Sequence, residues 1–306
     1  MLDAKHKSSD TWGMANRLPT ETRVQILNML CEGVSMRAIS RMTGVSTNTV
    51  DKLLVDAGMA CVDYHDRYVR GLKSKRVQVD EIWSFVYAKQ KNVKTAKAAP
   101  QGAGDAWTWT ALDSDSKLLV SYLVGPRNAE YANAFMNDLY ERLTDRVQLT
   151  SDGWKGYYQA VGNTFGSRVD YAQLVKIYGE GPKTEARYSP AVCIGAVKEK
   201  RIGRPKEKHI STSHVERQNL SMRMHMRRFT RLTNAHSKKF ENHCHMIALY
   251  TQWYNFVRIN SAVKMAPAMA AGISDRLWEM ADIVALIDAS EPVAKPRGPY
   301  KKRISN

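Results

Sequence analysis

Apolar residues at helical spacing dominate the first part of the chain. They recur at intervals of three and four after a polar start, which predicts an amphipathic helix that ends at Gly33. A short second helix capped by Ser35 and a third helix capped by Ser46 follow, with Gly44 in the turn between them. This order is typical of a helix-turn-helix domain, which we place at residues 19–62, although any small three-helix unit would show the same pattern.

The hydrophobic pattern changes after a polar linker at 63–75. Residues 77–87 are rich in β-branched and aromatic side chains and predict a strand with Asp80 near its middle. Further strands are predicted at 107–112, 118–124, 147–150 and 169–178, with helices at 128–143 and 154–161. Three strands, a helix, a strand, a helix and a strand form a mixed α/β sheet, and this order matches the ribonuclease-H-like fold.

The remaining segments surround this predicted sheet domain, which we assign to residues 76–260. Residues 179–212 contain several prolines and glycines and are expected to form a basic insertion loop. Helices are predicted at 213–231, 237–257 and 274–287, the last within a C-terminal helical segment at 261–290. Residues 1–18 are expected to be a flexible arm, and residues 291–306 a basic tail.

Charge indicates the kind of partner. Lys and Arg number 46 against 30 Asp and Glu, so the net charge is +16, and double-stranded DNA is the first candidate partner. The cysteines are far apart and form no CxxC pair, which argues against a zinc finger or a disulfide framework. The polar start predicts no secretory signal, and no apolar run approaches a membrane span, so we expect a cytoplasmic protein.

Candidate DNA contacts lie in two regions. The first turns of the third helix carry polar side chains that suit base edges and phosphates: Ser46, Thr47, Asn48, Thr49 and Lys52. The second region, 197–239, holds 13 basic and 3 acidic residues. Its candidates are Arg204 and Lys206, in a segment suited to a minor groove, and Arg217, Arg223, Arg227, Arg228 and Arg231.

Within that second region, Arg223, Arg227 and Arg231 have the spacing of one helical stripe. Such a row of like charges repels itself unless phosphates lie along it. The alternative is a solvated basic face.

Three carboxylates occupy positions that favour a metal site. Asp80 is inside an apolar strand, Asp152 ends another strand, and Glu216 lies in the first turn of a helix. A buried carboxylate is costly unless a positive group pairs with it, and Mg²⁺ prefers such oxygen ligands. Because successive strand residues point to opposite faces, we expect Glu81 to lie away from the site of Asp80. Each acid alone could equally be an ion-pair or helix-capping residue.

The sequence resembles the DDE transposases of bacterial insertion sequences, in the branch related to insertion sequence one. The residues that carry the resemblance are Val79-Asp80-Glu81-Ile82-Trp83, Thr150-Ser151-Asp152-Gly153-Trp154-Lys155-Gly156-Tyr157, Ser213-His214-Val215-Glu216-Arg217-Gln218-Asn219-Leu220, the basic run from Met222 to Asn234, and Tyr254-Asn255-Phe256-Val257-Arg258. The resemblance extends over about residues 20–285. Two departures are a helix-turn-helix where many relatives bind zinc, and Asn260-Ser261 where relatives tend to have His.

The resemblance implies that Asp80, Asp152 and Glu216 form the catalytic triad and bind two Mg²⁺ ions, for which Mn²⁺ can substitute. It implies cleavage of transposon ends and transfer of their 3′-hydroxyls to target DNA, in the bacterial nucleoid. Joining two ends in one event requires two active sites, so a homodimer on DNA is expected. A non-catalytic helix-turn-helix regulator and a metal nuclease without strand transfer remain alternatives, and product analysis distinguishes them.

Overall fold

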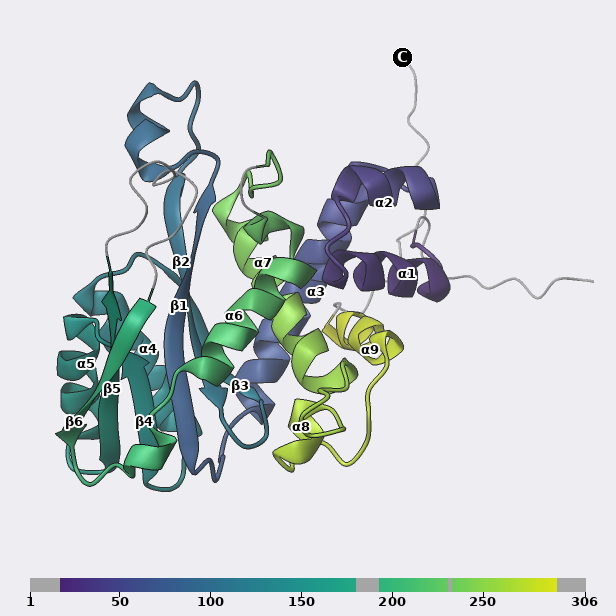
Figure 1. The fold of residues 1–306 in the computed structure, drawn as a ribbon. Helices are drawn as coiled ribbons and strands as arrows, with labels where there is room; N and C mark the ends of the chain where they lie inside the picture. The colour runs from purple at the N-terminus through teal and green to yellow at the C-terminus, as the bar shows by residue number, and fades with distance from the viewer. Residues whose placement is uncertain (1–16, 180–192, 231–232, 291–306) are drawn as a thin grey trace, which may run out of the picture.

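A six-stranded mixed sheet forms the centre of the protein (Figure 1). The computed structural model describes residues 17–179, 193–230 and 233–290 of the chain. The strand order is β3-β2-β1-β4-β5-β6. The bounds of the strands are β1 Arg76–Val86, β2 Gly104–Asp113, β3 Leu119–Gly125, β4 Val147–Asp152, β5 Val169–Tyr178 and β6 Cys193–Ile202.

The pairing directions confirm the predicted fold class. The first three strands pair antiparallel, β1 with β4 and β4 with β5 pair parallel, and β6 is antiparallel to β5. Helices cover both faces, as in the ribonuclease-H-like α/β class predicted from the order of elements. The helices are α1 Thr20–Cys31, α2 Met36–Thr43, α3 Thr47–Tyr68, α4 Ala129–Arg142, α5 Lys155–Phe165, α6 Ser213–His225, α7 Phe240–Gln252, α8 Pro267–Ala270 and α9 Met280–Ser290.

The two faces of β1 belong to two hydrophobic cores. Val77 and Val79 pack in the core beneath α4 and α5, whereas Ile82 packs in the core that contains α3, α6 and α7. This is the period-two alternation of a strand that is covered on both sides. Gln78 and Asp80 therefore share the face of Ile82, toward α6, and Glu81 starts from the opposite face.

The N-terminal helices are more closely integrated than the predicted 19–62 domain suggests. Ser35 and Ser46 cap α2 and α3 as predicted, with Gly44 in the left-handed conformation between the two helices. However, α3 does not end near Gly58 but continues to Tyr68, through half of the predicted linker at 63–75. A Cβ at Gly58 would lie 2.4 Å from the His245 Cβ, so this glycine permits close contact between α3 and α7.

Two further expectations about the irregular regions need correction. The second half of the predicted loop at 179–212 contains a strand, β6, which pairs with β5 at the edge of the sheet. Residues 180–192 lie outside the described residues. The C-terminal helix α9 begins at Met280 rather than Ser274. In the segment before it, Arg276 pairs with Asp282 at 2.7 Å, and Asp282 accepts a hydrogen bond from the Glu279 backbone N–H at 2.8 Å. The predicted arm and tail also lie outside the described residues, apart from the last residues of the arm.

The opposite edge of the sheet is covered by a side chain from the C-terminal helices. The fully buried Asn255 accepts a hydrogen bond from the Leu119 backbone N–H and donates one to the Leu119 carbonyl, both at 2.9 Å. Asn255 lies in a π-helical turn, Trp253–Val257, that continues α7. This contact satisfies the backbone groups of Leu119 at the start of the β3 edge. Across the described ranges, no helix combines the length and hydrophobicity needed to cross a bilayer.

Candidate active site

Gln78 determines where α6 lies relative to β1. Its buried side-chain oxygen accepts hydrogen bonds from the backbone N–H groups of His214 (2.8 Å) and Val215 (3.1 Å). These N–H groups belong to the first turn of α6, which has no partners for them within the helix. Because Gln78 and Asp80 share one face of β1, this cap places the first turn of α6, with Glu216, beside Asp80.

Asp80 is held by an amide from the same helix. Asn219 Nδ2 donates to Asp80 Oδ2 at 2.8 Å, and the Asn219 oxygen accepts from Thr110 on the neighbouring strand at 3.3 Å. Asn219 lies three residues after Glu216, on the same side of α6. Burial raises the pKa of Asp80 to about 6, and the charges of Asp152 and Glu216 add to this shift.

Asp152 ends β4 and is oriented by its own turn. Its Oδ1 accepts from the Trp154 backbone N–H at 3.0 Å. The buried Gln173 on β5 donates to the carbonyls of both Asp152 and Trp154 at 3.0 Å. Gly153 lies against Val175, so that even a methyl group at position 153 would be tightly placed. The Asp-Gly-Trp sequence is therefore a rigid turn that presents the carboxylate at the end of the strand.

Glu216 joins these two acids at one cleft. Asp80, Asp152 and Glu216 all line an opening of about 560 Å³, together with Arg127, Trp154 and Lys176. Lys176 Nζ lies 2.5 Å from Glu216 Oε1, and Thr212 donates to the same oxygen. The three acids singled out from the sequence thus line one cleft, but Glu216 is paired with Lys176 and is not part of the group whose ligand atoms lie within 4.8 Å of one another.

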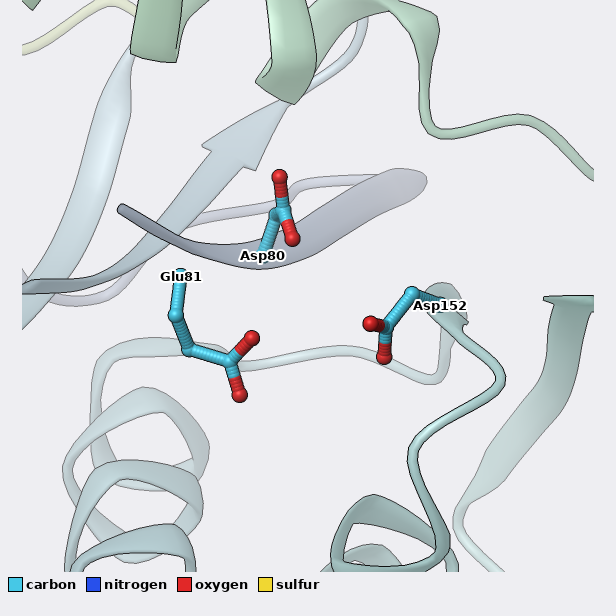
Figure 2. A group of neighbouring side chains, drawn as sticks. All are labelled: Asp80, Glu81 and Asp152. Atoms are coloured by element: carbon cyan, nitrogen blue, oxygen red, sulfur yellow. The ribbon is translucent and has the colours of Figure 1, made fainter. Parts of the chain in front are cut away.

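The expectation that Glu81 would lie away from the site is wrong. Ligand atoms of Asp80, Glu81 and Asp152 lie within 4.8 Å of one another (Figure 2). The alternation itself holds, because Asp80 and Glu81 leave β1 toward opposite faces. However, the pairing of β1 with β4 ends at Gln78 and Thr150, and the strands separate beyond that point. The two carboxylates therefore approach each other from opposite faces of β1, although only that of Asp80 lines the opening.

Arg127 is a residue of the site that the sequence analysis missed. It follows β3, and its guanidinium lies 3.3 Å from Glu81 Oε1 and 3.4 Å from Asp152 Oδ2. Burial raises the pKa of Glu81 to about 7, and Arg127 opposes this shift. No local pattern distinguishes this arginine, since its neighbours come from three separate strands and turns.

The residues of the cleft fit a divalent cation. The donors are hard carboxylate oxygens, as Mg²⁺ prefers. Asp80 and Asp152 both line the opening, and their ligand oxygens lie within 4.8 Å of each other. Burial and the nearby charges of Asp152 and Glu216 raise the pKa of Asp80, so its negative charge is costly without a cation. A cation among these oxygens would relieve this cost.

The predicted DNA contacts at the start of α3 are accessible. Ser46, Thr47, Asn48 and Lys52 are exposed and Thr49 is partly exposed, although Lys52 also pairs with Asp56 at 2.7 Å. Arg204 and Lys206 lie by the starts of β4 and β5, where Asp170 accepts from the Arg204 backbone N–H at 2.7 Å.

The predicted arginine stripe does not form as one helix. Helix α6 ends at His225, Arg227 belongs to a separate turn at Arg227–Phe229, and Arg231 lies outside the described residues. The break occurs at Met226, which is buried and has an extended backbone, so packing ends the helix there. Arg228 donates to the Asn242 carbonyl at 2.7 Å and is directed into the protein, unlike the exposed Arg217.

Comparisons with known proteins give distant structural likenesses. No protein-family model matches the chain, and no curated protein matches it. The piggyBac transposase synaptic complex with hairpin DNA has a TM-score of 0.37 at 10% identity over 95% of this chain and 77% of that chain. A simian T-cell lymphotropic virus intasome in complex with a PP2A regulatory subunit has a TM-score of 0.36 at 11% identity, over 93% and 80%. The Mos1 transposase paired-end complex has a TM-score of 0.22 at 14% identity, over 54% and 62%.

At these scores the likenesses carry no argument about activity. The fold class follows from the strand order and directions, and the chemistry of the cleft follows from its own residues.

Proposed function

We propose that the protein is a DDE-type DNA transposase of the insertion-sequence kind, with Asp80, Asp152 and Glu216 as its catalytic acids. One observation supports this proposal most strongly. Acids separated by 72 and 64 residues in the sequence line a single cleft at the end of a mixed sheet. Neither helix capping nor surface ion pairing requires all three to face the same opening.

In the proposed reaction, these acids hold two Mg²⁺ ions, for which Mn²⁺ can substitute. The ions activate the attacking oxygen and stabilise the leaving oxygen when bound. Asn219 orients the Asp80 carboxylate, and the turn at Gly153 holds Asp152 in place. In the first step water attacks the phosphorus and the bond to the 3′ oxygen breaks, which leaves a 3′-hydroxyl and a 5′-phosphate. In the second step this hydroxyl attacks a phosphorus of the target and forms a new phosphodiester, while the bond to the target's 3′ oxygen breaks and that oxygen leaves as a hydroxyl.

DNA recognition is assigned to the exposed start of α3, with Asn48 as the side chain best suited to a base edge. The basic residues Arg204, Lys206 and Arg217 would contact phosphates. Because two transposon ends must be joined together, the proposed active form is a homodimer on DNA. Sedimentation that shows one protomer on paired ends would contradict the dimer.

The experiment uses a supercoiled plasmid that carries both flanks of the gene. Purified protein with Mg²⁺ should nick the plasmid at the element's ends and yield joined products. Asp152→Asn and Glu216→Gln should each abolish both products, whereas Asp170→Asn, which removes an acid at the other end of the sheet, should retain them.

Each alternative outcome of this experiment would indicate a different function. Sequence-specific binding with no cleavage in Mg²⁺ or Mn²⁺ would identify a regulator, and cut ends without joined products would identify a nuclease. Undiminished activity of Asp152→Asn would refute the assignment of the acids.

A further inference from the structure

Arg127 lies between two indole rings at the mouth of the cleft. Its guanidinium carbon is 4.8 Å from the centre of the Trp154 ring and 5.3 Å from that of Trp107. Cation–π contacts of this kind hold a guanidinium without using its hydrogen-bond donors. The two rings therefore help to position Arg127 without occupying its N–H groups, one of which makes a long hydrogen bond of 3.4 Å to Asp152.

The contacts of Arg127 with acids are long. Its separations from Glu81 and Asp152, 3.3 and 3.4 Å, exceed the roughly 2.7–2.9 Å of a close charge-assisted hydrogen bond. Arg127 Nε and Glu81 Oε1 also lack hydrogen-bond partners within the described ranges. Arg127 is thus attracted to both acids but is not bound tightly by either of them.

Asp152 and Glu81 differ in their access to the cleft. Asp152 is 36% exposed and faces the cleft with Asp80 and Glu216, whereas the Glu81 side chain is 2% exposed and is absent from the cleft lining. A cation held by Asp80 and Asp152 would take over the charge that Arg127 now gives to Asp152. Arg127 would remain in contact with Glu81 and with the two indole rings, and its outer N–H groups would point into the cleft.

We propose that Arg127 binds a non-bridging oxygen of the phosphodiester that enters the cleft, and that Glu81 is a positioning residue for Arg127 rather than a metal ligand. A guanidinium suits this role because its planar set of donors matches phosphate oxygens. The inference rests on the proposed function, since it assumes that a phosphodiester enters the cleft.

The first test measures Mn²⁺ binding by calorimetry, with no DNA present. Asp152→Asn should lose binding. Glu81→Gln should bind Mn²⁺ within about threefold of the unaltered protein, because its carboxylate is not a ligand. Arg127→Ala should bind Mn²⁺ more tightly, by about threefold or more, because a neighbouring positive charge has been removed.

The second test measures nicking of the same plasmid with saturating Mn²⁺. Arg127→Ala and Arg127→Lys should each fall by about 100-fold or more, in the range seen when a transition-state charge partner is removed. Glu81→Gln should fall less, and the double variant Glu81→Gln/Arg127→Ala should be no slower than Arg127→Ala alone. The matched control is Arg168→Ala, which removes another arginine stacked on a ring, that of Tyr140. Thermal melting verifies that each variant folds.

The outcomes separate the two claims. Loss of Mn²⁺ binding in Glu81→Gln, to the extent seen in Asp152→Asn, would make Glu81 a ligand and overturn its positioning role. Unchanged nicking in Arg127→Ala would overturn the phosphate role while leaving the transposase proposal intact. Absence of nicking by the unaltered protein would overturn the proposed function itself, and the role of Arg127 with it.

Discussion

The contact between α3 and α7 at Gly58 allows a quantitative test of how the N-terminal helices are joined to the rest of the protein. We consider the substitution Gly58→Ala. The added Cβ would lie 2.4 Å from the His245 Cβ and 2.6 Å from its Cα, whereas carbon atoms normally approach to about 3.5–4.0 Å. Since one of the obstructing atoms belongs to the backbone, the helices must separate by roughly 1 Å.

Two opposing contributions to the free energy of unfolding determine the stability of the variant. Alanine stabilises a helix interior by about 1 kcal/mol relative to glycine. Overpacking a close contact costs about 1–3 kcal/mol, and an obstruction by backbone favours the upper part of that range. We therefore expect a net destabilisation of about 1–2 kcal/mol, which corresponds to a fall in Tm of roughly 2–8 °C.

Calorimetric melting of the variant measures this change. The matched control is Gly162→Ala in α5, where the glycine is exposed and a Cβ meets nothing within 4 Å. That variant should gain up to about 1 kcal/mol. If both substitutions raised Tm equally, α3 and α7 would not be in contact at Gly58, and the helices at 19–62 would form a separate domain as the sequence alone suggests.

The remaining predictions concern acid stability, metal binding and DNA binding. Burial lowers the pKa of His65 to about 4 and of His243 to about 3, so both are neutral in the folded state. The unfolded chain protonates these histidines below pH 6.5, so the stability that each contributes is complete above that pH and falls by up to about 1.4 kcal/mol per pH unit toward pH 4. Urea unfolding of His243→Gln should lack this contribution to the pH dependence. Asn219→Ala should weaken Mn²⁺ binding or nicking by about 10- to 100-fold, as expected for a residue that orients a ligand. Asn48→Ala should weaken binding to the element's ends by about 1–3 kcal/mol, measured by fluorescence anisotropy at fixed salt.

Each of these predictions has a result that would contradict it. Asp80 and Glu81 change the stability in the opposite direction to the histidines. Their raised pKa values mean that the folded state binds protons more readily than the unfolded chain, so these two residues add stability as pH falls. A pH dependence of the unfolding free energy that His243→Gln leaves unchanged would refute the histidine argument. If Asn48→Ala lost as much affinity for unrelated DNA as for the element's ends, Asn48 would contact a phosphate rather than a base edge. Full Mn²⁺ affinity and full nicking in Asn219→Ala would show that Asp80 needs no support from α6.

The sequence by itself indicated most of the elements and their order along the chain, apart from β6 and the ends of α3 and α9. Periodicity is a local property, so the buried strands around Asp80 and Asp152 could be recognised from residues next to them, and so could the capped helices of the N-terminal unit. The succession of elements then indicated the fold class, whereas the order of the strands in the sheet came from the structure. The three acids could be selected because each occupies an unusual place within its own element.

Distances between elements were decided only by the tertiary structure. The sequence marks Gly58 as a helix end, but contact with α7 gives it the role of a packing position. Glu81 alternates away from Asp80 as expected, yet the separation of β1 from β4 brings their carboxylates together. Arg127 meets its partners only after β1, β2 and the turn after β4 have assembled around it. A local pattern specifies which face of an element is buried, whereas the meeting of charges from different elements depends on how closely those elements pack.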